Sequence, residues 1–341
     1  MAHLVVVSFR LGYTDGVSIE AQKWIDAFRR LGHQVTSVAG DGVADVLVDG
    51  LAIRSRDALD VPALSRGLAR ADLVVVENMA SLPLNPAASE ALWGLLEGRP
   101  ALFRHHDLAW QRPEGTSSPP PRDDLLWRHV TINDLSRRQL AERGVSATTM
   151  YNSFDCEPPL GRRDLARAAL EVQDERLFLL PTRAIARKNV AGALRLAEEL
   201  DAVLWILGPA EDDYDVELAR LLASSPVLVT RGLGWGLDIH DAYAASDLVV
   251  LSSTWEGFGN PVLESVTHRC PLAVYPYPVL GEIRSFGFSF FDLGDRTGIR
   301  GYLENPDDRL LHENQNLARQ NFNLADLTGR LAPLLETWGL K

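Results

Sequence analysis

The chain has 341 residues, of which 46% are hydrophobic and 23% charged, and its formal net charge at pH 7 is −12. This length exceeds that of a domain with one ordinary hydrophobic core, so we expect two domains. The excess of acidic residues excludes a nucleic-acid partner. The two cysteines, Cys156 and Cys270, lack companion ligands, which argues against a disulfide framework or a zinc site.

No apolar run approaches the roughly 20 residues that span a bilayer. The first residues enter a strand pattern at once, without the charged and apolar regions of a signal peptide. We therefore expect a cytoplasmic protein with no transmembrane segment. This expectation leaves room for peripheral contact with a membrane.

Strand and helix patterns alternate through the first half of the chain. A buried strand over residues 3–9 precedes a glycine-containing loop and an amphipathic helix over residues 19–31. Repeated strand-helix units of this kind predict a doubly wound parallel sheet. The further predicted elements are strands over residues 72–76, 101–104, 130–132 and 148–150, and helices near residues 87–96 and 135–143.

Polar clusters follow two of these strands. Glu77-Asn78 comes after one strand and His105-His106-Asp107 after the next, and such positions in a parallel sheet border the ligand site. Simple capping of the loops is the alternative role for these side chains. The Pro/Ser-rich segment over residues 110–123 is predicted to be a loop, either over an acceptor site or inert.

A linker rich in proline and charge, residues 156–163, separates a second alternating region. We place the boundary after residue 155, which gives domains over residues 1–155 and 156–323. The second domain is also predicted to be Rossmann-like. Its strands are expected over residues 177–181, 203–207, 227–230, 248–251 and 272–275. Its helices are expected over residues 190–200, 216–222 and 238–245. The final helices are expected near residues 310–321 and 324–338.

A basic pair follows the strand over residues 177–181. Arg183 and Lys188 lie in the segment T-R-A-I-A-R-K-N at a predicted helix start, where the helix dipole disfavours positive charge. Cations in that position indicate a bound anion, and Arg187 is predicted to face outward beside them. Only three of the 34 basic residues are lysines, so Lys188 departs from the usual choice of arginine.

The segment of residues 252–268, SSTWEGFGNPVLESVTH, follows the apolar run of residues 248–251. The pattern indicates a strand, a tight loop and a helix start, with Pro261 as an early helical residue. Free N–H groups at such a start favour a phosphate or a hydroxyl-rich ligand. Glu256 and Glu264 bracket the loop with E-x7-E spacing. This block closely resembles the donor-sugar signature of retaining GT-B glycosyltransferases of family GT4.

The resemblance implies a fold and a function. The fold would be α/β of the GT-B type, with two Rossmann-like domains facing each other across a cleft and a final helix, about residues 324–341, packed back on the first domain. The function would be transfer of a hexose, with retention, from a nucleotide sugar such as UDP- or GDP-hexose to an unidentified acceptor hydroxyl. The first domain would hold the acceptor and the second the donor, with no cofactor and no metal.

The resemblance also implies roles for individual residues. Arg183 and Lys188 would hold the pyrophosphate and stabilise the charge of the leaving group. Glu264 would accept hydrogen bonds from the ribose, and Glu256 would face the hexose. The remaining expected site residues are Phe258, Gly259 and Asn260 through their N–H groups, Gly234 beside the nucleobase, Gly16 near the donor phosphates, and His105 of the His-His-Asp step as a catalytic residue.

Two rival functions stay open at this point. A GT-B nucleotide-sugar epimerase would need its own acid and base carboxylates in place of the E-x7-E pair. A catalytically silent sugar- or nucleotide-binding protein would have no chemical reason to contain Arg183, Lys188, Glu256 and Glu264 together.

Overall fold

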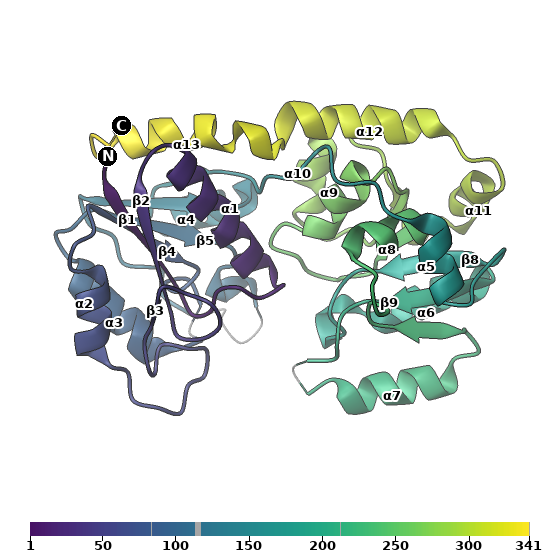
Figure 1. The fold of residues 1–341 in the computed structure, drawn as a ribbon, viewed down its shortest axis with the longest axis horizontal. Helices are drawn as coiled ribbons and strands as arrows, with labels where there is room; N and C mark the ends of the chain where they lie inside the picture. Colours follow the sequence, from purple (N-terminus) through teal and green to yellow (C-terminus); the bar gives the residue numbers. More distant parts are fainter. Residues whose placement is uncertain (83, 113–116, 212, 341) are drawn as a thin grey trace. The chain divides into compact units, whose positions relative to one another are not determined.

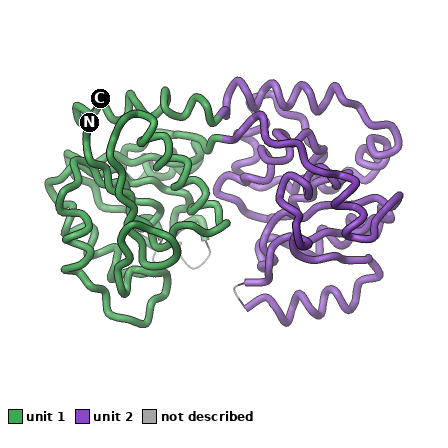
Figure 2. The backbone as a smooth tube through the Cα atoms, viewed as in Figure 1, with its two compact units in different colours: residues 1–153, 324–341 green, residues 154–323 purple. Residues whose placement is uncertain are grey.

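The computed structural model describes residues 1–82, 84–112, 117–211 and 213–340, which form two compact units (Figure 2). Unit 1 comprises residues 1–153 and 324–341, and unit 2 comprises residues 154–323. Residues 113–116 of the predicted Pro/Ser-rich loop lie outside the described residues. Among the helices that are described, none is long and apolar enough to cross a bilayer.

Unit 1 contains a parallel sheet of seven strands in the order β3-β2-β1-β4-β5-β6-β7. Figure 1 labels the strands β1 to β5 of this sheet. Its elements are β1 (His3–Ser8), α1 (Gly16–Arg30), β2 (Gln34–Ala39), β3 (Val46–Leu47), α2 (Val61–Leu68), β4 (Leu73–Glu77), α3 (Pro86–Leu96), β5 (Ala101–His105), η1 (Ala109–Gln111), β6 (Trp127–Thr131), α4 (Asp134–Ala141), β7 (Ala147–Thr149), and, after unit 2, η4 (Leu324–Asp326) and α13 (Leu327–Glu336).

Helices cover both faces of this sheet, which explains the continuous apolar runs in its central strands β1 and β4. Along β1, Leu4 and Val6 pack in one core with α1 and α13, whereas Val5 and Val7 pack in the other with α2 and α3. The final helix α13 contributes Leu331, which is fully buried in the first of these cores. The chain therefore returns to unit 1 because its last apolar helix face completes that core.

Unit 2 contains a second parallel sheet, of six strands in the order β10-β9-β8-β11-β12-β13. Its elements are α5 (Arg163–Ala169), β8 (Arg176–Leu180), η3 (Ala186–Lys188), α6 (Val190–Glu199), β9 (Ala202–Ile206), α7 (Asp215–Ser224), β10 (Val229–Arg231), α8 (Ile239–Ala245), β11 (Leu248–Leu251), α9 (Asn260–Thr267), β12 (Leu272–Val274), α10 (Leu280–Ser285), β13 (Phe291–Asp292), α11 (Arg296–Glu304) and α12 (Asp308–Asn321).

The strand order of both sheets reverses at one point. In unit 1 this point lies between β1 and β4, and in unit 2 it lies between β8 and β11. Ligands of doubly wound sheets bind outside the carboxyl ends of the strands at such a switch point. The loops that follow β8 and β11 contain the predicted basic pair and the E-x7-E block, so the topology of unit 2 brings the two motifs to the same place.

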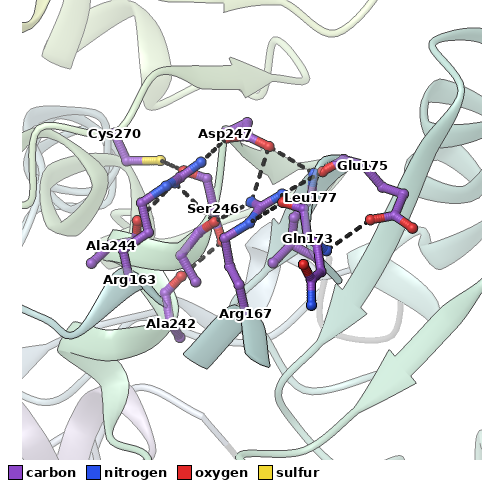
Figure 3. Close-up of polar contacts among 11 residues, drawn as sticks. Arg163, Arg167, Gln173, Glu175, Leu177, Ala242, Ala244, Ser246, Asp247 and Cys270 are labelled. Carbon is purple, nitrogen blue, oxygen red and sulfur yellow. Dashed lines mark hydrogen bonds and ion pairs between the residues drawn. The ribbon is translucent and has the colours of Figure 1, made fainter. Parts of the chain in front are cut away.

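A carboxylate beside the start of β11 joins this strand to β8 and α5 (Figure 3). Asp247 accepts hydrogen bonds from the Leu177 N–H at 2.9 Å and from the guanidinium groups of Arg163 at 2.5 Å and Arg167 at 3.3 Å. The Arg167 side chain is only 9% exposed and also donates to the backbone carbonyl of Ala245 at 2.8 Å. Asp247 thus neutralises a nearly buried cation.

Asp247→Ala is expected to lower the free energy of unfolding by about 2–3 kcal/mol, because it leaves the buried Arg167 guanidinium without its counter-charge. Denaturant titration measures this change. The matched control is Asp308→Ala, since Asp308 is 88% exposed and lies 3.9 Å from Arg269. The control should stay within about 0.5 kcal/mol of the wild type. Equal stability of the two variants would contradict the structural role of Asp247.

Candidate functional site

The loop after β8 forms a single 3₁₀ turn, η3, before helix α6. Asn189 ends this turn in the left-handed conformation, with φ of 49°, and its side-chain oxygen caps α6 by accepting from the Gly192 N–H at 3.2 Å. Asparagine tolerates this conformation and is also a preferred N-cap residue. The turn therefore places Lys188 directly before the helix start.

Backbone and side-chain hydrogen bonds join this loop to the loop after β11. The Ser252 hydroxyl donates to the Lys188 carbonyl at 2.8 Å, and the Thr254 N–H donates to the Arg187 carbonyl at 2.9 Å. The Asn189 amide donates to the Ser252 carbonyl at 3.3 Å. Because the backbones are tied together, side chains of both loops meet in a defined geometry.

The centre of the site is an ion cluster around Glu256. Lys188 Nζ lies 2.5 Å from one carboxylate oxygen, and Arg187 Nη1 lies 3.1 Å from the other. Lys188 and Glu256 are each only 6% exposed. Burial opposes ionisation of the Glu256 carboxyl, but the charges of Lys188 and Arg187 outweigh it and lower its pKa. The structure thus brings two predicted site residues, Lys188 and Glu256, into direct contact.

The prediction that Arg187 faces outward is wrong. Its guanidinium donates to the Trp255 carbonyl at 3.0 Å as well as to Glu256. The sequence offered no sign of this, because the direction of a side chain in a single 3₁₀ turn depends on the turn itself.

Arg183 lies in the same loop and has a different partner. Its Nη1 is 2.5 Å from a carboxylate oxygen of Glu211, and both side chains are partly exposed. The backbone of Arg183 packs closely against Gly208. A Cβ atom at Gly208 would lie 2.5 Å from the Arg183 backbone, so this contact requires glycine. A phosphate group could replace the Glu211 carboxylate as the partner of this arginine without breaking a buried contact.

The start of α9 requires the glycine that precedes it. Gly259 has φ of 91°, and a Cβ atom at this position would lie 2.2 Å from the Tyr277 hydroxyl, which donates to the Phe258 carbonyl at 2.8 Å. Phe258 is buried, and Asn260 is the first residue of the helix. Backbone atoms, and not a side chain, therefore lie at residue 259 directly before α9. The helix dipole favours negative charge at this end of the helix.

Glu264 lies one turn into α9 and has a partner that the sequence analysis missed. The Tyr243 hydroxyl, from α8, donates to a Glu264 carboxylate oxygen at 2.9 Å. Tyr243 is only 1% exposed, so nearly all of this side chain is buried beside the carboxylate. A buried tyrosine needs a partner for its hydroxyl, but sequence alone does not tell which group supplies it.

The glycine-rich loop over residues 232–236 follows β10. Gly232 and Gly236 have positive φ angles of 71° and 78°, and the Gly234 carbonyl accepts from the Leu237 N–H at 3.1 Å. The Trp235 side chain is fully exposed. The role of Gly234 beside a nucleobase stays a prediction.

In unit 1 the two polar clusters predicted from the sequence do meet. His106 Nε2 lies 2.9 Å from a Glu77 carboxylate oxygen, and the Asn78 side-chain oxygen accepts from the His106 and Asp107 N–H groups. Glu77 is buried, and its other oxygen pairs with Arg104 at 3.3 Å. Burial opposes ionisation of Glu77, but Arg104 and the hydrogen bond from His106 lower its pKa.

His105, the predicted catalytic histidine, has a buried ring in the structure. Its Nδ1 lies 2.5 Å from the Ser81 hydroxyl and its Nε2 lies 2.8 Å from His129 Nδ1. Burial lowers the pKa of His105 well below the usual range for histidine. Because side chains alternate along β5, His105 lies on the face of Phe103, which stacks on the same His129. A catalytic role for His105 stays a prediction.

Gly16, predicted near the donor phosphates, is the first residue of α1. Asp15 caps this helix, and its carboxylate accepts from the Val17 and Ser18 N–H groups at 3.1 and 3.2 Å. The cap directs the carboxylate into the helix start, so the N–H groups of these two residues are already paired. A phosphate contact at Gly16 also stays a prediction.

The arrangement in unit 2 suits an anionic ligand that carries hydroxyl groups. The loop after β8 contains three cations, Arg183, Arg187 and Lys188, which pair with Glu211 and Glu256. The loop after β11 ends at the start of α9, which contains Glu264. In the described part of the chain, no group of three or more histidine, cysteine, aspartate or glutamate residues is placed to hold a metal ion.

Known proteins share this fold and this region of sequence. Residues 162–289, which include both loops, match the family described as Glycosyl transferases group 1. Mannosylglucosylglycerate synthase of Thermotoga maritima is 25% identical, with 90% of this chain and 88% of the relative covered, and the enzyme of the same name from Petrotoga mobilis is 24% identical, with 96% and 98% covered.

The fold of this chain is also similar to that of solved structures. The Anabaena protein HepE, in complex with UDP-glucose, superposes with a TM-score of 0.72 at 16% identity, and 99% of this chain and all of that chain are covered. Sucrose-phosphate synthase from Thermosynechococcus elongatus gives a TM-score of 0.75 at 13% identity, with 99% of each chain covered. The protein is therefore a glycosyltransferase with the GT-B fold, and the match to the family of group 1 glycosyl transferases lies within its second unit, over residues 162–289.

Proposed function

We propose that this glycosyltransferase transfers a hexose, with retention of the anomeric configuration, from a UDP- or GDP-hexose to the hydroxyl group of an acceptor. The observation that carries this proposal is the cluster of Lys188, Arg187 and Glu256 beside the start of α9. HepE, which has the same fold, was solved with UDP-glucose, and the relatives named above make a mannosyl product. Both facts support a nucleotide-hexose donor.

The reaction needs positive charge where the donor breaks. The bond between the anomeric carbon and the phosphate oxygen breaks, and its electron pair stays on the nucleoside diphosphate. Lys188 and Arg183 stabilise that developing charge more strongly than the ground state, which accelerates the step. The acceptor oxygen forms a bond to the anomeric carbon on the same face, and its proton passes to the departing phosphate oxygen.

The remaining residues bind and orient the donor. Glu264 accepts hydrogen bonds from the ribose hydroxyls, and Glu256 faces the hexose while it balances the charge of Lys188. The N–H groups of Phe258, Gly259 and Asn260 meet the donor at the start of α9. Gly234 lies beside the nucleobase. Unit 1 binds the acceptor, with His105 as its catalytic residue.

A screen of nucleotide hexoses tests the proposal. One UDP- or GDP-hexose should raise the melting temperature and be hydrolysed slowly to free nucleoside diphosphate, and NMR of a transfer product should show the anomeric configuration of the donor. Formation of an epimeric nucleotide sugar without release of nucleoside diphosphate would indicate an epimerase instead. Binding with neither hydrolysis nor transfer would indicate a silent protein.

The proposed mechanism uses no metal and no cofactor, because Arg183 and Lys188 supply the positive charge that a divalent ion supplies elsewhere. Transfer rates should therefore be unchanged after treatment with EDTA. Measurement of initial rates before and after chelation, with manganese added back to one sample, checks this. Loss of activity that manganese restores would refute metal independence and leave the identity of the donor unaffected.

A further inference from the structure

We propose that Tyr243 is a positioning residue for donor binding, which holds the Glu264 carboxylate in the orientation that accepts the ribose hydroxyls of the nucleoside diphosphate. This inference rests on the proposed function, since it takes Glu264 as the ribose ligand. Tyr243 itself contacts no donor atom in this account. Its effect passes through one hydrogen bond, from its hydroxyl to a Glu264 oxygen at 2.9 Å.

A stack of rings from α8 and the end of α9 fixes the position of Tyr243. Its ring stacks on His268 with centroids 4.4 Å apart and an interplanar angle of 17°, and His268 stacks in turn on His240. The Tyr243 side chain is buried, so it has little freedom to take another rotamer. The hydroxyl is therefore a rigid donor.

The proton positions in this stack follow from its hydrogen bonds. His268 Nδ1 lies 2.7 Å from the Glu264 carbonyl, and since a carbonyl only accepts, this nitrogen carries the proton. His268 Nε2 then accepts from His240 Nδ1 at 2.9 Å while His268 is neutral, and burial lowers the pKa of His268. Two residues of α8 thus restrain Glu264. Tyr243 contacts its side chain directly, and His240 acts on its backbone carbonyl by way of His268.

The Tyr243 hydroxyl keeps its proton at neutral pH and therefore remains a hydrogen-bond donor. Burial raises the pKa of its hydroxyl well above the usual value, and the negative charge of Glu264 raises it further. A fixed donor on one carboxylate oxygen restricts the orientations that the Glu264 carboxylate can take. Preorganisation of this kind increases affinity because the ligand does not bear the cost of ordering the side chain.

Calorimetric titration of Tyr243→Phe with UDP and with GDP tests the inference, using whichever nucleotide binds the wild type more tightly. Tyr243→Phe should weaken binding of this diphosphate about two- to tenfold, because the Glu264 side chain must then be ordered when the ligand binds. The same variant should bind the 2′,3′-dideoxy diphosphate as the wild type does, because that ligand lacks the hydroxyls that Glu264 accepts. Combined with Glu264→Gln, the substitution should cause no further loss.

The controls separate a positioning role from a structural one. Tyr302→Phe removes the same atom from a tyrosine on α11 and should leave both affinities unchanged. An equal loss of affinity for the diphosphate and its dideoxy analogue would show that Tyr243 only supports the fold. Wild-type affinity in Tyr243→Phe together with weak binding by Glu264→Gln would overturn the inference alone. Wild-type affinity in Glu264→Gln, or no binding of either nucleotide by the wild type, would overturn the proposed ribose contact and the inference with it.

Discussion

Lys188→Met is expected to lower the turnover number for hexosyl transfer by about 10²–10³-fold, the usual result of removing one preorganised group that stabilises developing negative charge. Methionine keeps most of the length and volume of the side chain, so the loss reports mainly the charge. Steady-state rates at saturating donor measure it. Wild-type turnover in this variant would refute the role of Lys188 at the leaving group.

The same substitution should also lower stability. Removal of Lys188 leaves Glu256, only 6% exposed, with Arg187 as its remaining cationic neighbour at 3.1 Å. Loss of one partner of a buried ion pair costs about 3–5 kcal/mol, and the contact with Arg187 should reduce that cost. Arg309→Met, on α12, is the matched control, because Arg309 is 79% exposed. Rates must be compared at a temperature at which both variants are folded.

The two glutamates of the E-x7-E block should respond differently to the same substitution. Glu264→Gln is expected to weaken binding of both the free nucleoside diphosphate and the donor about tenfold or more, because both ligands contain the ribose. Glu256→Gln is expected to lower turnover by a similar factor while diphosphate affinity does not fall. Calorimetric titration beside steady-state kinetics of both variants measures these effects.

The ion cluster gives a physical reason for the expected behaviour of Glu256→Gln. In the wild type the Glu256 carboxylate pairs with both Lys188 and Arg187 and offsets one of their two positive charges. An uncharged amide leaves both cations available to the phosphates, so diphosphate affinity should be retained or increased. Equal loss of diphosphate binding in the two variants would contradict the hexose-facing role of Glu256. Weakened binding only in Glu256→Gln would show that the roles of the two residues are reversed.

The sequence predicted the fold class correctly because the relevant signals are local. Strands covered by helices on both faces have continuous apolar runs, such as residues 4–7 in β1 and 248–251 in β11. Short elements without such a run were missed, including β13 and the helix α5, whose buried residues are few. The predicted final helix over residues 324–338 is divided in the structure into the 3₁₀ turn η4 and α13.

By itself the sequence determined the alternation of strands and helices. It placed Arg183, Lys188 and Glu256 on loops after particular strands, and Glu264 in the helix that follows the second of these loops. Only the tertiary structure decided which side chains meet. Lys188 and Glu256 are 68 positions apart, Tyr243 and Glu264 are 21 apart, and Glu77 and His106 are 29 apart. Such pairs depend on the order of the strands in the sheet, which determines which loops are neighbours. They also depend on the register between neighbouring strands. Register also decides that His106, and not His105, contacts Glu77, because adjacent positions near the end of a strand point to opposite faces of the sheet.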